Sequence, residues 1–160
     1  MSDGLHIAQE LRSRREKAEA AWSERMRAFR VRSRPDFPIG YVRLDDPNSQ
    51  GDPTELVVEV ANSHSTRWYG YRYLKDSPAD GILFTYESDV RHKFTNREVE
   101  IDLDIYWFDA DGNMVGSTTV AAHEPTPISL DRAYRFVLEV PAGTVDIQDG
   151  RVLYSEYASN

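Results

Sequence analysis

The sequence contains no cysteine, and no run of apolar residues in it is long enough to cross a membrane as a helix. The lack of cysteine excludes disulfides, thiol nucleophiles and cysteine-ligated metal centres. Glycine-rich phosphate loops and the Gly-x-Ser-x-Gly motif of serine hydrolases are absent as well. His64, His92 and His123 are scattered, so we expect them at the surface rather than in a metal site. The residues give no positive sign of catalysis, and we expect no cofactor.

The net charge of −8 hides an uneven distribution along the 160 residues. Residues 1–34 carry nine basic and five acidic side chains, so this segment is positive while the remainder is strongly negative. A basic arm on an acidic body suits contact with an anionic surface, and we expect nucleic acid to bind only through this arm, if at all. The first residues lack the layout of a signal peptide, so we expect a cytoplasmic protein or one incorporated into an assembled particle.

Residues 1–34 form a predicted N-terminal arm, in which residues 5–32 have the composition of a helix. At about 100° per residue, one narrow apolar stripe runs along this helix, formed by Leu11, Ala18, Trp22, Met26 and Phe29. Water cannot satisfy such a stripe, so either the β domain of the same chain or another subunit must cover it. We expect contact with another chain, which would make the protein oligomeric, and docking on its own domain is the alternative.

Residues 35–54 are rich in proline and glycine and form a predicted connector, with one short strand at residues 41–44. From residue 55 to residue 160 the pattern is that of a mainly β domain. Strands are predicted at residues 56–61, 82–86, 90–95, 98–108, 114–121, 134–140 and 151–154, and a short helix is predicted at residues 63–74. Asp111 and Gly112 separate two of these strands, which is typical of a hairpin turn.

The strongest local pattern lies at residues 98–109, where acidic and apolar residues alternate. It predicts one long strand with a core face and a row of carboxylates on the other face, from Glu98 through Glu100 and Asp102 to Asp104. Such an acidic ladder is typical of a solvated face that basic residues neutralise across the sheet. As an alternative, Glu100, Asp102 and Asp104 could bind Ca²⁺ or Mg²⁺, or could supply a pair of carboxylates for acid–base catalysis.

Aromatic and basic residues are concentrated in the predicted short helix. This aromatic-basic cluster consists of Arg67, Trp68, Tyr71 and Arg72. Rings interleaved with guanidinium groups suit stacking on single-stranded nucleic acid, on a sugar or at a protein interface. The alternative is a helix whose rings seal one end of the β core, which the helical spacing favours. The acidic body argues further against a nucleic-acid groove at this place.

Several short motifs, taken in their order and spacing, resemble the DUF192 family, also called UPF0127, from about residue 55 to the end of the chain. The matching segments are residues 58–61, 81–84, 103–105, 108–112 and 137–143. The resemblance implies a compact jelly-roll-like β-sandwich or barrel. The chain departs from the family pattern at residues 70–72, where the family reads Gly-Leu-Met, and at residues 93–97, where it reads Trp-Met-Lys-Asn-Thr. The resemblance therefore implies a fold and no particular chemistry.

Taken together, these patterns predict a non-catalytic structural or interaction module. We expect its helical arm to attach the β domain to a larger assembly of protein subunits, such as a viral particle or another multi-subunit structure. One alternative is a metal-dependent or carbohydrate-directed enzyme that uses the acidic ladder. The other is a protein that binds a small ligand in the interior of the jelly roll. An enzyme should bring at least two ladder carboxylates together in a concave pocket.

Overall fold

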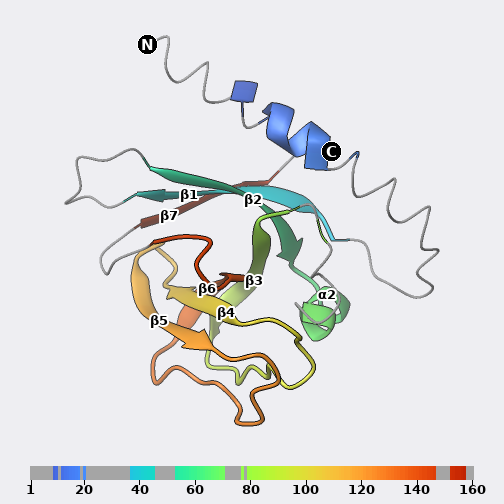
Figure 1. Ribbon diagram of the computed structural model, residues 1–160. Helices are drawn as coiled ribbons and strands as arrows, with labels where there is room; N and C mark the ends of the chain where they lie inside the picture. The colour runs from blue at the N-terminus through green and yellow to red at the C-terminus, as the bar shows by residue number, and fades with distance from the viewer. Residues whose placement is uncertain are drawn as a thin grey trace.

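The computed structural model describes residues 9–10, 12–18, 20, 37–45, 53–70, 77, 79–146 and 152–157. Its elements, in chain order, are β1 (Ile39–Asp45), β2 (Thr54–Ala61), α2 (His64–Tyr69), β3 (Gly81–Val90), β4 (Leu103–Phe108), β5 (Met114–Val120), β6 (Tyr134–Pro141) and β7 (Val152–Tyr157). Ahead of β1, the described residues between 9 and 20 are helical. The predicted mainly β architecture is confirmed (Figure 1).

The described strands form a single sheet in the order β5-β4-β6-β3-β2-β1-β7. Within this sheet β2 and β3 run parallel, whereas the other neighbouring strands run antiparallel. A parallel pair needs a crossover connection, and α2 lies in the segment that joins β2 to β3. A capping box fixes the start of α2, because Ser63 and Thr66 each accept a hydrogen bond from the backbone N–H of the other. The helix ends at Gly70, whose φ of 54° lies in the left-handed region.

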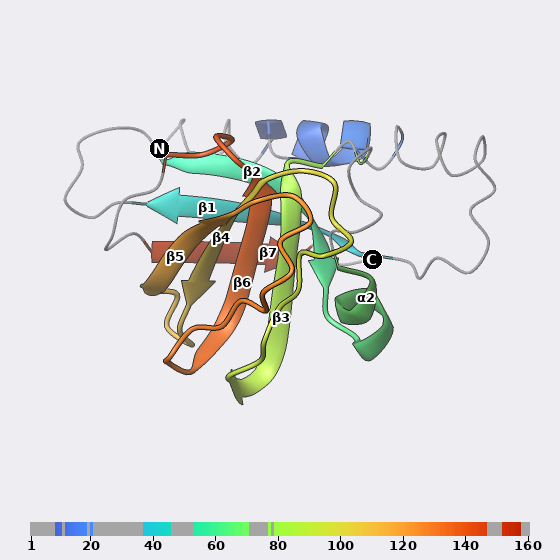
Figure 2. The same ribbon diagram turned by 60° about the horizontal axis from the view of Figure 1, so that its bottom comes forward.

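The sheet curls so that the edge strand β7 reaches the β4–β5 turn near the opposite edge. The backbone N–H of Leu153 on β7 donates a hydrogen bond of 2.6 Å to the carbonyl oxygen of Gly112, which lies in the β4–β5 turn. In Figure 2, β1, β2 and β7 run across the group formed by β3, β4, β5 and β6. Between these two groups lies the inner cluster of buried side chains, formed by Val42, Leu44, Leu56, Val58, Val60, Leu83, Tyr106, Phe108, Leu138, Val140, Val145 and Leu153.

The opposite face of the same strands carries a second hydrophobic cluster. Because side chains alternate along a strand, Ile105 and Trp107 on β4 point to this outer face while their neighbours join the inner cluster. The outer cluster contains Phe37, Ala61, Ile82, Phe84, Val99, Leu103, Ile105, Trp107, Val120, Tyr134 and Val137. Loop residues such as Phe94 and Ile128 pack against it, and these two also pair through the backbone. Loops rather than a second sheet therefore cover this face.

Two of the predicted strands differ from the observed ones. The long strand expected at residues 98–108 begins only at Leu103, and residues 98–102 consist of the end of a turn, one bend and irregular backbone. The strand expected at residues 90–95 is absent from the described structure, where β3 extends to Val90 and a loop follows. Burial still alternates ahead of β4, since Val99 is buried while Glu98 and Glu100 are exposed. Alternating burial alone therefore does not require a hydrogen-bonded ladder.

The hairpin turn between β4 and β5 has the predicted position. A side-chain oxygen of Asp109 accepts hydrogen bonds from the backbone N–H groups of Asp111 (3.0 Å) and Asn113 (2.9 Å). Gly112 has a φ of 85°, which a residue with a Cβ atom rarely adopts. These residues therefore build a turn, in which Asp109 satisfies backbone donors.

The described part of the N-terminal arm lies against β1 and β2 (Figure 1). Ala18 is 6% exposed and packs in a small cluster with Ile39 and Val57. Arg14 donates hydrogen bonds to the side chain of Asp80 (3.3 Å) and to a backbone carbonyl of β2. Ala18 thus contacts its own chain, whereas the predicted stripe residues Leu11, Trp22, Met26 and Phe29 lie outside the described residues. In the described part of the chain, no helix combines the length and the apolar character needed to span a membrane.

Candidate ligand-binding site

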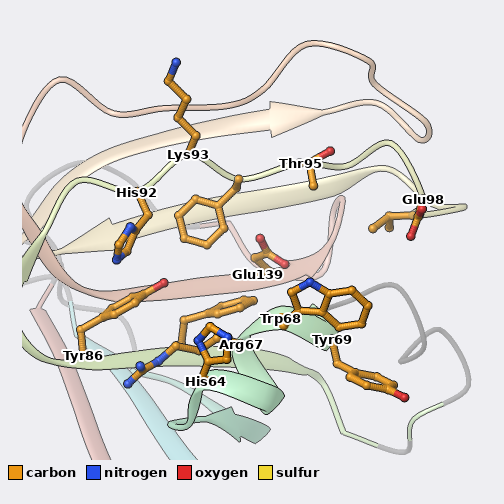
Figure 3. Close-up of a pocket in the computed structure, with 13 residues that line it drawn as sticks. His64, Arg67, Trp68, Tyr69, Tyr86, His92, Lys93, Thr95, Glu98 and Glu139 are labelled. Atoms are coloured by element: carbon orange, nitrogen blue, oxygen red, sulfur yellow. The ribbon is translucent and has the colours of Figure 1, made fainter. Parts of the chain in front are cut away.

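A cavity of about 400 Å³ lies on the outer face of the sheet. Its walls come from α2, β3, β6 and the loop of residues 92–99 (Figure 3). Among the described residues, five aromatic side chains line it: Trp68, Tyr69, Phe84, Tyr86 and Phe94. Its volume is within the range of sites that bind small molecules, and such sites are mostly apolar with a few polar groups.

The central polar group of this cavity is the carboxyl of Glu139. In Figure 3 the carboxyl lies between the side chains of α2 and those of the 92–99 loop. Glu139 is 5% exposed, and its direct neighbours on the adjacent strands are Ile82 and Ile105. Burial raises the pKa of Glu139 to about 8. Among the described residues, none donates a hydrogen bond to this carboxyl.

An unsatisfied buried carboxyl costs stability even when it is protonated, and the cost is on the order of 1–3 kcal/mol in mutational data. A sequence that needed only a hydrophobic core would place an apolar residue at position 139, as it does at the neighbouring positions. The carboxyl therefore has a role that the core packing does not require. A group that enters the cavity could accept or donate a hydrogen bond there, or could neutralise the ionised carboxylate.

Edge-to-face contacts hold the aromatic wall of the cavity in place. The ring centroids of Phe84 and Phe94 are 5.5 Å apart, and those of Tyr86 and Tyr134 are 6.1 Å apart. The hydroxyl of Tyr134 donates a hydrogen bond of 2.9 Å to the carbonyl oxygen of His92 and accepts one of 2.8 Å from the N–H of the same residue. This pair of hydrogen bonds to the backbone ties the start of the 92–99 loop to β6. Desolvation by burial raises the pKa of the Tyr134 hydroxyl to about 12, so it stays a donor at neutral pH.

Arg67 attaches α2 to β3. Its Nε and Nη2 atoms donate hydrogen bonds of 3.0 and 2.5 Å to the carbonyl oxygen of Thr85, and Nη2 also reaches the carbonyl oxygen of Asn62 at 3.2 Å. Its Cζ atom lies 4.6 Å from the centroid of the Tyr86 ring. The guanidinium is thus bound to backbone oxygens and stacked on a ring. The burial of Tyr86 raises its pKa well above the usual value, so this hydroxyl is neutral as well.

Half of the predicted aromatic-basic cluster lies at this cavity. Arg67 and Trp68 line it, whereas Tyr71 and Arg72 lie outside the described residues. Trp68 is 61% exposed, and its ring meets that of Tyr69 at a centroid distance of 5.7 Å. Trp68 thus forms part of the mouth of the cavity, with much of the indole in contact with solvent. His64 and His92 line the same cavity and are exposed, as predicted.

Most carboxylates of the acidic ladder lie outside this cavity, and two of them bind other parts of the chain. Asp102 accepts a hydrogen bond of 2.8 Å from the N–H of Ala122, and Asp104 accepts bonds from the N–H of Gly143 (2.9 Å) and the hydroxyl of Thr119 (2.5 Å). These two carboxylates therefore fix loops and a neighbouring strand. Of the ladder, Glu98 alone lines the cavity, and Glu100 does not. No group of three or more His, Asp or Glu within the described ranges is placed to hold a metal ion.

Glu139 was not predicted as a site residue, although residues 134–140 were predicted as a strand. The signal in the sequence is a single acidic residue within the apolar run Phe136 to Val140. A carboxylate at that place is informative only once the strand is known to be central, because a polar residue on an edge or solvated face is ordinary. The sheet order, in which β6 lies between β4 and β3, supplies that knowledge.

Comparison with known proteins gives a family and a fold. The model of the DUF192 family, described as an uncharacterized ACR, matches residues 47–153. A crystal structure from Sinorhizobium meliloti, named as a candidate transcription regulator, superposes with a TM-score of 0.69 and 24% identity over 77% of this chain and 98% of that one. A protein of unknown function from Novosphingobium aromaticivorans gives a TM-score of 0.62 and 18% identity over 71% of this chain and 83% of that one. At these identities the two structures show a shared fold alone. No curated protein matches the chain. Since the family model covers well over half of the sequence, the chain belongs to the DUF192 family.

Proposed function

We propose that this protein is a non-catalytic binding protein for a small molecule, which occupies the cavity above Glu139. The bound molecule places a polar group at the Glu139 carboxyl and an apolar part against the rings of Phe84, Tyr86 and Phe94. The observation that carries this proposal is the buried carboxyl, which faces an aromatic cavity and receives no hydrogen bond from a described residue. Buried polar groups in cavities of this kind commonly orient a ligand.

The contacts of the acidic ladder support binding over catalysis. An enzyme built on the ladder would need at least two of its carboxylates in one pocket, and among the described residues Glu98 alone meets this condition. Asp102 and Asp104 already accept hydrogen bonds from backbone or hydroxyl donors. A metal-dependent reaction would have to displace these bonds before the oxygens could bind a cation.

Attachment to a larger assembly through the arm remains a separate prediction. The contact of Ala18 with Ile39 and Val57 lies within one chain, which supports docking of this part of the arm on its own domain. Ligand binding at Glu139 does not depend on how the rest of the arm is covered. The cavity lies beside α2, whereas the described arm residues lie against β1 and β2.

The proposal is tested by a fragment survey with the full chain. A set of small amines, alcohols, carboxylates and sugars is screened through the backbone amide shifts in ¹⁵N NMR spectra. We expect binding fragments to shift amides in α2 and in residues 92–99. Trp68→Ala should weaken the binding of these fragments, because it removes a ring from the mouth of the cavity. Arg132→Ala, an exposed residue outside the cavity, is the control. Shifts confined to other regions of the chain would refute the proposal.

A further inference from the structure

We propose that the molecule bound in this cavity is an organic cation, whose protonated amine pairs with the carboxylate of Glu139 and whose hydrocarbon part packs against the aromatic walls. This inference rests on the proposed binding function and names the chemical class of its ligand. It follows from the charges around Glu139, from the nature of the walls and from the proton balance of binding.

No described cation is placed to neutralise Glu139. From β3 and β4 its neighbours are Ile82 and Ile105, and Glu59 on β2 lies one strand beyond Ile82. Burial is the one cause that moves the pKa of Glu139, so no positive charge among the described residues offsets the loss of hydration. No described residue therefore takes the position of a positive partner for this carboxylate, and we assign that position to the ligand.

The basic groups at the cavity face other atoms. The guanidinium of Arg67 on α2 donates to the carbonyl oxygens of Thr85 and Asn62 and covers the ring of Tyr86. The side chain of Lys93 points away from the cavity in Figure 3. The remaining titratable groups that line the cavity are the exposed His64 and His92, the hydroxyl groups of Tyr69 and Tyr86, and the carboxylate of Glu98.

The walls favour a cation as well. An aromatic ring carries partial negative charge on its faces, so it attracts an ammonium group within about 6 Å of its centroid. Five aromatic residues of the described chain line this cavity, together with a second carboxylate, that of Glu98. An organic anion would have to approach the carboxyl groups of Glu139 and Glu98. It would find no compensating charge in Arg67, because that guanidinium is hydrogen-bonded to backbone carbonyl oxygens. A neutral molecule would gain the ring contacts without the ion pair.

Binding of an ammonium ion requires that Glu139 give up a proton. With a pKa of about 8, the carboxyl of the empty protein is mostly protonated at pH 7. The ammonium ion enters with its charge, the carboxylic acid releases one proton to solvent, and the ion pair remains in the cavity, so that charge is conserved. The affinity for an amine should therefore rise about tenfold per pH unit below pH 7 and level off above pH 8. A neutral hydrogen-bond acceptor, which needs the protonated carboxyl, would bind with constant affinity below pH 7 and would lose affinity above pH 8.

The test compares three probes of equal size and different charge, namely 2-phenylethylamine, 2-phenylethanol and phenylacetate. Their binding to the full chain is measured by isothermal titration calorimetry at pH 6, 7 and 8, in two buffers of different ionisation enthalpy. We expect the amine to bind at least tenfold more tightly than the alcohol at pH 8, and phenylacetate to bind more weakly still. At pH 6 and 7 the amine should release close to one proton per molecule bound.

Glu139→Gln should remove both the preference for the amine and the release of a proton. Glu87→Gln is the matched control, because Glu87 is exposed on β3 and lies outside the cavity. If Glu139→Gln fails to fold, the number of protons that the unmodified protein releases per amine bound still tests the inference. Equal binding of amine and alcohol would overturn the cation inference and leave the proposed binding function standing. Binding of the amine without proton release, or no binding of the amine, would also overturn the inference, while the fragment survey judges the binding function separately.

Discussion

Glu139 on β6 lies directly opposite Ile82 on β3 in the antiparallel register, and both side chains are buried. On the other side of β6 its partner is Ile105, so two branched aliphatic residues flank one carboxyl. Cross-strand pairs in a sheet usually match charge with opposite charge, or apolar with apolar. Here the acidic residue has no such match on the sheet. Its partner must come from the cavity above the sheet, or the carboxyl must stay protonated.

The stability of the protein should fall as the pH rises from about 5 to 8. Burial raises the pKa of the Glu139 carboxyl from its ordinary value of 4.5 to about 8 in the folded protein, so between these values the folded state binds a proton that the unfolded state has lost. Since stability decreases with pH wherever the folded state holds more protons, the slope is negative, at most about 1.4 kcal/mol per pH unit. Urea unfolding across this range measures it. Glu139→Gln should flatten the curve, and an equally steep curve in that variant would assign the effect to another group.

Replacement of Glu139 by leucine should stabilise the fold. Leucine is similar in size and removes a buried carboxyl that lies between two isoleucines and accepts no hydrogen bond from a described residue, so we expect the free energy of unfolding at pH 7 to rise by about 1–3 kcal/mol. The exposed Glu87→Leu should change it by less than about 0.5 kcal/mol. Such a gain would show that the native residue is kept at a cost to stability, as at many functional sites. A loss of stability in Glu139→Leu would mean that the carboxyl has a stabilising partner in the folded protein.

Much of the sheet could be predicted from the sequence, because alternation and turn residues are local signals. Leu103, Ile105 and Trp107 share one buried face as expected, although Tyr106 and Phe108 are buried on the other face, and Asp109 to Asn113 build the expected turn. The parallel pairing of β2 with β3 could not be predicted, since it depends on where α2 directs the chain. The sequence pattern showed the acidic ladder, but it did not show which groups the carboxylates bind. Asp102 and Asp104 bind backbone N–H groups that lie 20 and 39 residues away, contacts that no local pattern encodes. Glu139 could be identified as a site residue only from the sheet order, which places β6 between β4 and β3.

Core and surface positions of the β4 region should differ sharply in stability. Leu103 is 1% exposed in the outer cluster, so Leu103→Ala should cost about 2–5 kcal/mol. Glu100 is exposed three residues earlier, and Glu100→Ala should stay near about 0.5 kcal/mol. Denaturant unfolding of the two variants compares them directly. The reverse order would mean that the two faces of this segment are assigned wrongly.

The N-terminal arm should contribute to the stability of a single chain. Ala18 is buried against Ile39 and Val57, so Ala18→Asp places a charge in an apolar contact and should lower the free energy of unfolding by about 1–3 kcal/mol. This loss should not depend on protein concentration. Gln9→Asp, at an exposed position of the same helical segment, is the control. If Ala18→Asp instead left stability unchanged and altered the sedimentation mass, the stripe would contact another subunit, as its narrowness predicts.

The most direct measurement of the central claim is the titration of Glu139 itself, followed through the ¹³C shift of its side-chain carboxyl carbon. In the empty protein the midpoint should lie near pH 8. Saturation with 2-phenylethylamine should lower this midpoint by about three pH units or more, as the release of nearly one proton at pH 6 requires, because the ammonium ion stabilises the charged form, whereas 2-phenylethanol should not lower it. A midpoint near the ordinary value of 4.5 in the empty protein, or a midpoint that the amine leaves unchanged, would contradict the account.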